Sequence, residues 1–303
     1  MTGTKVIKLK LDGDGAAGKL PRLRGSVVDE ALVVFDTTEF NVVDEYRDAL
    51  LGKTKELNAD QKQLQEIVKR LEGREDVARY GTKAGILLTC LIENSSEREF
   101  EFRIQRQIDH VGYRLASDRK MTVKGNVGDF TGMEMKKGEV NINGNTTDHA
   151  GMGMEGGTIN IRGDARDHTG GLMKGGTINV DGDAGADTGQ GMTGGTVNVK
   201  GGSDARTGYE MEGGLITVGK DAGESTGRQM EGGRITVGGN TGILTGHSMR
   251  KGEIDVKGTV GHEAGEQMSG GTIKAGMKVL SISEKYEWGE IWQSGERLRP
   301  IER

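Results

Sequence analysis

Short segments that alternate apolar and polar residues recur through the second half of the chain. Val140–Ile142, Ile159–Ile161 and Ile178–Val180 each run apolar–polar–apolar, and the pattern continues to Ile273–Ala275. A period of two predicts β-strands with one buried face. Because each segment is too short to be stable alone, we expect the copies to stack and to bury a shared interior.

Methionine and glycine repeat at the same interval. The methionines recur at one constant spacing, without insertion or deletion, at Met135, Met154, Met173, Met192, Met211, Met230, Met249 and Met268. Two glycine columns with the same spacing begin at Gly132 and Gly138. The pattern predicts a mainly β protein whose residues 116–280 form a right-handed parallel β-solenoid with 19-residue coils of two or three short strands each. Eight coils at about 4.8 Å give a rod of roughly 38 Å.

The columns also predict which side chains lie inside. Unbranched methionine suits a narrow interior, so we expect core filler rather than metal ligands. Glycine suits corners that need a positive φ. One column should face outward as an asparagine ladder, at Asn141, Asn160, Asn179 and Asn198. Another is small and is expected to be semi-buried, at Thr131, Thr169, Thr188, Thr207, Thr226 and Thr245.

Residues 1–115 have a different character, and we expect a small α+β domain that caps the solenoid and serves in docking. Lys5–Leu11 and Ala31–Phe35 are predicted strands. A helix is predicted over residues 59–72, with Asn58 as its N-cap and Gly73 as its stop.

Two further strands are predicted before the solenoid. Gly85–Glu93 is almost entirely apolar, and residues 100–104 alternate as its partner after a turn at residues 94–96. At the other end, residues 281–303 form a predicted cap or tail. Trp288 and Trp292 should cover the last coil, because exposed sheet edges need protection; the alternative is a partner-binding patch.

Composition excludes several classes of protein. The chain has 53 glycines but only 2 prolines, which excludes collagen. A net charge of −5 does not favour binding to nucleic acid, which calls for an excess of basic residues. A single cysteine, Cys90, excludes a disulfide framework, a four-cysteine zinc site and a cysteine-ligated iron–sulfur cluster within this chain. No long apolar run or signal-like start is present, so we expect a cytoplasmic protein without membrane contact.

Few residues of the sequence suggest a catalytic or binding role. Cys90 lies in an apolar segment and is expected to be a buried, inert thiol. Gly223–Gly227 matches the pattern of a nucleophile elbow, but no helix follows it, which favours coincidence. We assign no catalytic, cofactor-binding or metal residue.

Four surface candidates for a metal site come from neighbouring coils. His149 and His168 occupy the same position of successive repeats, with Asp148 and Asp167 beside them. Imidazoles stacked about 5 Å apart with carboxylates could hold a metal ion. A solvated His/Asp ladder is the favoured alternative, since the histidine column breaks at once and its next members are Asp187 and Arg206.

The repeat resembles a known family. Gly128–Gly138, Gly182–Gly185 and Met192–Gly195 are similar to the GxGxG β-helix family, and the resemblance covers residues 112–276. This family includes the β-helical subunit of formylmethanofuran dehydrogenase and the C-terminal domain of the glutamate synthase large chain. The resemblance implies a structural β-helix, with chemistry on partner subunits that carry molybdenum or tungsten pterin, iron–sulfur clusters or flavin.

These observations lead to one principal expectation about function. We expect a non-catalytic scaffold subunit of a cytoplasmic oxidoreductase complex, with no cofactor of its own and larger catalytic subunits as partners. The alternative is a free-standing hydrolase or other enzyme that uses a groove on the solenoid, with His149 and His168 as its best candidates. A carbohydrate-contacting solenoid is a weaker third class.

Overall fold

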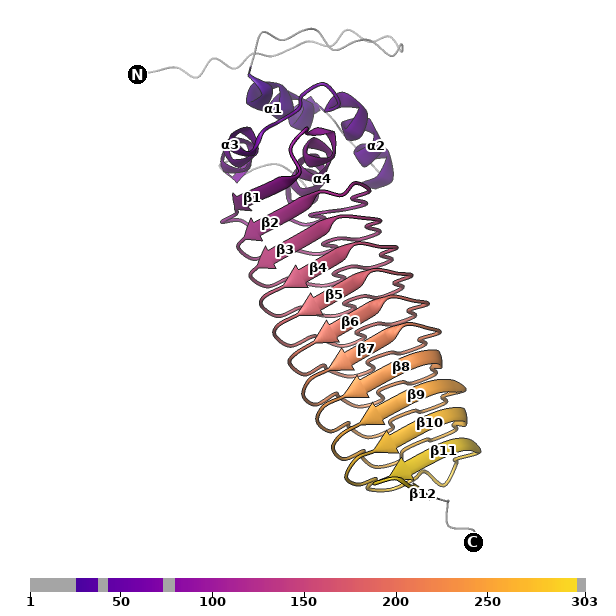
Figure 1. Cartoon of the computed structure of the whole chain (residues 1–303). Helices are drawn as coiled ribbons and strands as arrows, with labels where there is room; N and C mark the ends of the chain where they lie inside the picture. The colour runs from indigo at the N-terminus through magenta and orange to yellow at the C-terminus, as the bar shows by residue number, and fades with distance from the viewer. Residues whose placement is uncertain (1–25, 38–42, 73–79, 299–303) are drawn as a thin grey trace.

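The computed structural model describes residues 26–37, 43–72 and 80–298. It is a parallel β-solenoid with 19-residue coils, as predicted, preceded by helices (Figure 1). One sheet holds twelve strands in sequence order. The strands are β1 Glu99–Arg103, β2 Lys120–Lys124, β3 Glu139–Asn143, β4 Thr158–Ile161, β5 Thr177–Val180, β6 Thr196–Val199, β7 Leu215–Val218, β8 Glu231–Val237, β9 Lys251–Val256, β10 Ser269–Ala275, β11 Trp288–Gln293 and β12 Glu296–Leu298.

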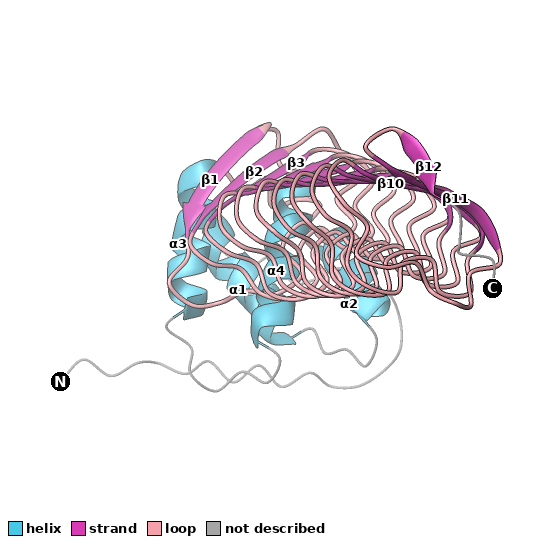
Figure 2. Cartoon of the chain, turned by 90° about the horizontal axis from the view of Figure 1, so that it is seen from below, coloured by secondary structure: helices cyan, strands magenta, loops and turns pink. Residues whose placement is uncertain are grey.

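The sheet forms one wall of the rod, and turns close the other sides (Figure 2). In the central coils Ile159 pairs with Ile178 and Asn160 with Asn179, so each buried residue stacks on its own copy. A second column consists of isolated bridges, such as Ala184 to Ser203. The ladder extends beyond the predicted limits of 116 and 280, since β1 and β11 join it as parallel strands.

The turns are hydrogen-bonded between coils as thoroughly as the strands. The N–H of His149 donates to the Asp167 carbonyl at 2.8 Å, one coil onward. The N–H of Gly151 donates to the Thr131 carbonyl at 2.7 Å, one coil back. Backbone groups at the corners are therefore satisfied without water.

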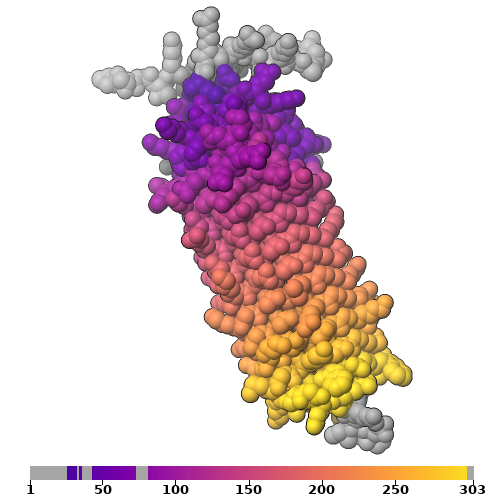
Figure 3. Space-filling model, in the orientation of Figure 1, coloured from indigo at the N-terminus to yellow at the C-terminus, as the bar shows by residue number. Residues whose placement is uncertain are grey.

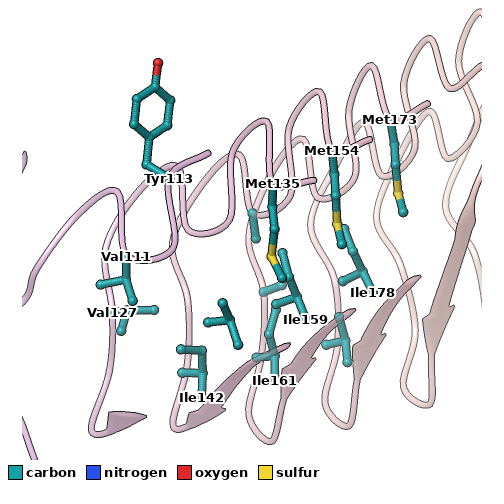
Figure 4. Packing of buried hydrophobic residues seen from close by; sticks show 14 of the residues in the cluster. Val111, Tyr113, Val127, Met135, Ile142, Met154, Ile159, Ile161, Met173 and Ile178 are labelled. Carbon is teal, nitrogen blue, oxygen red and sulfur yellow. The ribbon is translucent and has the colours of Figure 1, made fainter. Parts of the chain in front are cut away.

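The interior is packed by the predicted columns (Figure 4). Met135, Met154 and Met173 are fully buried, which confirms them as core residues. The threonine column is more deeply buried than predicted, because each hydroxyl finds a local acceptor. Thr188 is 0% exposed, and its Oγ1 donates to the Gly185 carbonyl at 2.9 Å.

Glycine is required where a corner closes onto the core. Gly151 has a φ of 68°, and an added Cβ would lie 2.2 Å from Cδ1 of Ile178, on the next coil. No side chain fits such a position without displacing the isoleucine. The gap-free spacing therefore keeps each glycine opposite the same core position in every coil.

In the described part of the chain, four helices precede the sheet: α1 Val27–Thr37, α2 Val43–Lys53, α3 Gln61–Glu72 and α4 Tyr80–Asn94. The predicted strands Ala31–Phe35 and Gly85–Glu93 are therefore wrong, since both segments are helical. Their apolar runs reflect burial, and a short buried run does not distinguish helix from strand. In α4, Leu87, Leu88 and Leu91 are at most 1% exposed.

The predicted helix over residues 59–72 is confirmed as α3, but its cap is different. Asp60 and Gln63 form a reciprocal capping box, with both hydrogen bonds at 2.8 Å. Asn58 instead accepts a hydrogen bond from the N–H of Ser96. The predicted stop at Gly73 and the predicted strand Lys5–Leu11 lie outside the described residues.

Helix α3 covers the edge of the first strand with two glutamine side chains. The amide of Gln61 exchanges two hydrogen bonds with the backbone of Glu101, and Gln65 does the same with Arg103 at 3.0 and 3.3 Å. Four helical residues rise about 6 Å and two strand residues about 6.6 Å, so the two spacings match. Strand β1 was predicted correctly, but its partners are β2 and this helix.

The C-terminal end is closed without burying tryptophan. Ile291 is 1% exposed and occupies the core position of β11, whereas Trp288 is 75% exposed. The prediction that Trp288 covers the last coil is wrong, because alternation along β11 turns it outward. Strand β12 instead pairs antiparallel with β11 and covers its edge. Figure 3 shows the stacked coils as one continuous rod that extends from the helices to the C-terminal strands.

A charge at the centre of the rod should unfold it. Ile178→Asp places an unpaired carboxylate among neighbours that are fully buried, and we expect a loss of more than about 4 kcal/mol in the free energy of unfolding. Urea titration followed by circular dichroism measures this loss. Thr177→Asp, on the outer face of the same strand, should change stability by less than about 0.5 kcal/mol. Equal losses would contradict the assignment of inner and outer faces.

Removal of the two capping glutamines should cause local fraying of β1. In the double variant Gln61→Leu and Gln65→Leu, amide hydrogen exchange at Glu101 and Arg103 should become faster, because their edge groups lose their partners. The central strands should exchange as before. The control Lys69→Leu changes an exposed residue of the same helix. Unchanged exchange at β1 would show that the glutamines do not protect the edge.

Candidate functional site

A column of aromatic rings runs along one corner of the solenoid. Adjacent ring centroids lie 4.9 Å apart between His110 and Phe130, 4.7 Å between Phe130 and His149, and 4.8 Å between His149 and His168. All four residues have φ between 57° and 63°. The same left-handed corner in each coil therefore projects these side chains in one direction.

The two predicted histidines do come together, but in a geometry that does not suit chelation. The rings of His149 and His168 are stacked with an interplanar angle of 11°. Metal ions bind in the plane of an imidazole, so parallel stacked rings direct their nitrogen lone pairs along parallel lines. Nδ1 of His168 lies 2.9 Å from Oε1 of Gln190 instead.

The carboxylate of Asp167 serves the backbone, since its Oδ1 accepts a hydrogen bond from the N–H of Ala186 at 2.9 Å. Asp148 contributes its own N–H, which donates to Oδ1 of Asp129 one coil back at 3.1 Å. Within residues 26–37, 43–72 and 80–298, no group of three or more histidine, cysteine or acidic residues is placed to hold a metal ion.

After His168 the side chains of this column are no longer aromatic rings but the ion pair of Asp187 and Arg206. The side chain of Arg206 donates from Nε to Oδ1 of Asp187 at 2.7 Å, and this contact raises the pKa of the guanidinium. Asp187 is 6% exposed, and the Arg206 guanidinium balances its buried negative charge.

His110 is the buried member of the ring column. It is 7% exposed, and its ring meets Tyr113 edge-on with centroids 5.6 Å apart. Burial lowers the pKa of His110 to about 4 and outweighs the opposite influence of the Asp129 carboxylate. The imidazole is therefore neutral at neutral pH.

The outer face of the sheet carries the predicted asparagine ladder. Nδ2 of Asn160 donates to Oδ1 of Asn141 at 2.8 Å, and Asn179 and Asn198 continue the chain at 2.8 and 2.9 Å. The amides are half-buried and bonded to one another. The ladder confirms the outward orientation predicted from the alternation.

The two candidate nucleophiles, Cys90 and Ser225, are both buried. Cys90 is buried, and burial raises its pKa to about 12, so its thiolate is strongly disfavoured. Ser225 is 6% exposed and occupies a left-handed corner with a φ of 57°. Since a turn and then a strand follow it, the Gly223–Gly227 motif belongs to the repeat and does not form a nucleophile elbow.

Sequence reasoning missed the junction between the helices and the first coils. Arg114 contacts Asp44 of α2 and Glu134 of the next coil, each at 2.7 Å. Tyr113 donates its hydroxyl proton to Asp44 as well. A shallow groove of about 490 Å³ lies at the capped edge of the sheet, lined by Gln61, Glu99, Phe100, Glu101, Lys120 and Thr122. Of these residues, Gln61 is already hydrogen-bonded to the backbone of Glu101.

No protein-family model matches this chain, and no curated protein matches its sequence. The resemblance to the GxGxG β-helix family stays a prediction. Among the described helices, none is both long enough and apolar enough to cross a membrane.

Protonation of His110 should destabilise the fold. Its folded pKa of about 4 lies below the ordinary 6.5, so the unfolded chain takes up the proton first. Stability is then fully present above pH 6.5 and falls by roughly 2 to 3 kcal/mol as the pH drops toward 4.

Urea titrations at several pH values measure this dependence, and His110→Phe isolates it. Phenylalanine already occupies the next position of the column, at Phe130 with a φ of 58°. The variant should keep its stability down to lower pH than the natural chain. If the two pH profiles run parallel, another group is responsible.

Proposed function

We propose that this chain is a non-catalytic scaffold subunit that holds larger catalytic subunits in a fixed arrangement. The observation that carries the proposal is the parallel ladder from β1 to β11, filled along its length by buried methionine, isoleucine and valine. Such a rod resists bending, because each coil is hydrogen-bonded to the coils on both sides.

The chemistry of the surface supports a binding role. The middle of the sheet face is uncharged, with threonine and asparagine facing outward from Thr158 to Asn198. Interface centres are depleted in charged residues and enriched in tryptophan and arginine. Trp288 lies at the C-terminal end of this face and is 75% exposed.

The nature of the partners follows from the GxGxG resemblance. We propose that they are catalytic subunits of an oxidoreductase complex, which carry molybdenum or tungsten pterin, iron–sulfur clusters or flavin. Neither the buried, protonated Cys90 nor the stacked pair His149 and His168 is placed to hold such groups.

Native mass spectrometry of the complex purified through this chain tests the proposal. We expect larger subunits at fixed stoichiometry, while the chain expressed alone has no chromophore and turns over no substrate. A purified chain that hydrolyses an ester or amide, and loses this activity in His149→Ala or His168→Ala, would show that it is an enzyme.

A matched pair of variants locates the docking end. Trp288→Lys should release the partner subunits without lowering the melting temperature, since the side chain is 75% exposed. Met277→Lys changes a 65% exposed apolar residue near the same end and serves as the control. Equal retention of the subunits in both variants would exclude Trp288 from the interface.

A further inference from the structure

The outer face of the sheet changes character along the rod. On β4, β5 and β6 its outward side chains are only threonine and asparagine. Charged side chains lie on both sides of this neutral centre, on β1 to β3 and again on β8 to β10. We call the outward residues of β1 to β10 the sheet face.

One column of the sheet face carries two ion pairs in the same order. Lys120 and Glu139 occupy it on β2 and β3, and Arg234 and Glu253 occupy it on β8 and β9. Lys120 lies 3.9 Å from Glu139, and Arg234 lies 3.7 Å from Glu253. The four side chains are between 27% and 48% exposed, so each pair contributes little to its own chain and keeps an open side toward solvent.

We propose that the sheet face binds a second copy of this chain, with the two rods antiparallel. The two-fold axis lies in the contact plane, perpendicular to the columns and between β5 and β6. It brings each column opposite itself in reverse order, as an isologous contact requires. Lys120 then faces Glu253 of the second copy, Glu139 faces Arg234, and the axis repeats both pairs.

The neighbouring column agrees with the same axis. It places Glu101 of β1 opposite Lys274 of β10, two side chains that are 56% and 47% exposed. The groove of about 490 Å³ opens at this point, and Glu99 and Glu101 in its lining suit a lysine side chain. At the centre Asn179 faces Asn198. Each ladder amide donates one N–H within its own chain, which leaves the second to donate across the contact.

Like charges disfavour the adjacent registers. An axis moved by half a coil toward β6 would place Glu139 opposite Glu253, and one moved by half a coil toward β5 would place Lys120 opposite Arg234. In the proposed register Lys124 comes opposite Lys257 at the rim, but each ammonium lies against a carboxylate of its own chain. The charges therefore select the axis between β5 and β6.

The sheet face has the area that a dimer needs. Nine coil steps span about 43 Å and five strand residues about 16 Å, so each copy buries roughly 700 Å², within the range of specific complexes. The axis also keeps the strands of the two copies aligned, which is a common way for sheets to pack face to face. The dimer goes beyond the proposed function, and it leaves Trp288 of β11 outside the paired strands.

Sedimentation velocity of the purified full chain over a concentration series tests the proposal. The natural chain should form a dimer as the concentration rises, and added salt should weaken this dimer because exposed charges are screened. Arg234→Glu should raise the dissociation constant by about tenfold or more, since the new carboxylate faces Glu139 of the second copy. Glu139→Arg should raise it for the matching reason.

The double variant with Glu139→Arg and Arg234→Glu is the decisive measurement. It restores both pairs of opposite charge between the copies, so its dissociation constant should return toward that of the natural chain. The two positions are five coils apart in their own chain, or about 24 Å, so the rescue can arise only between copies. Arg166→Glu is the control, because it reverses an exposed charge in a turn outside the sheet and should leave the dimer intact.

Two results would overturn the proposal. One is a natural chain that stays monomeric at every concentration, including the case in which a different protein covers the sheet face. The other is a dimer that the single reversals leave unchanged or that the double variant does not restore. Both measurements use this chain alone, so neither result decides whether catalytic subunits bind it, which native mass spectrometry measures separately.

Discussion

Hydrogen bonds between successive coils are the interaction on which the other features of this protein depend. They join the strands, and they also join the turns, where His149 donates to Asp167 and Gly151 to Thr131. Because each partner lies about one repeat away in sequence, an inserted residue would shift the donors of its coil against their acceptors in the coil before it. This requirement accounts for the constant length of the repeat and for glycine at corners such as Gly151.

A ladder of this kind leaves unpaired groups at both ends, and the chain closes each end differently. At the start, the side-chain amides of Gln61 and Gln65 take the place of a neighbouring strand. At the finish, β12 turns back and pairs antiparallel with β11. Both devices protect backbone groups from a wrong partner, which is the hazard of any exposed sheet edge.

The same periodicity limits the chemistry that the rod can perform. Equivalent side chains in adjacent coils project in parallel, which builds ladders of asparagine and stacks of rings such as His149 and His168. Parallel groups bind one another well but converge poorly on a metal ion or a substrate. Residues that depart from the repeat, such as Leu172 and Trp288, instead expose large apolar side chains.

Spacing within the sequence determined the solenoid, its methionine core, the asparagine ladder and helix α3, because each depends on contacts between residues at regular intervals. Tertiary structure decided the rest. The apolar segment Gly85–Glu93 is helical because it is enclosed by other helices and by the first coils, and no local pattern encodes that enclosure. Trp288 is exposed because the alternation of β11 assigns the core position to Ile291. Gln61 caps β1 only because α3 lies against that edge, a contact between residues 40 positions apart. Local spacing determines which face of a helix or strand is buried. Which residues cover that face depends on the tertiary structure, because the covering residues are distant in sequence.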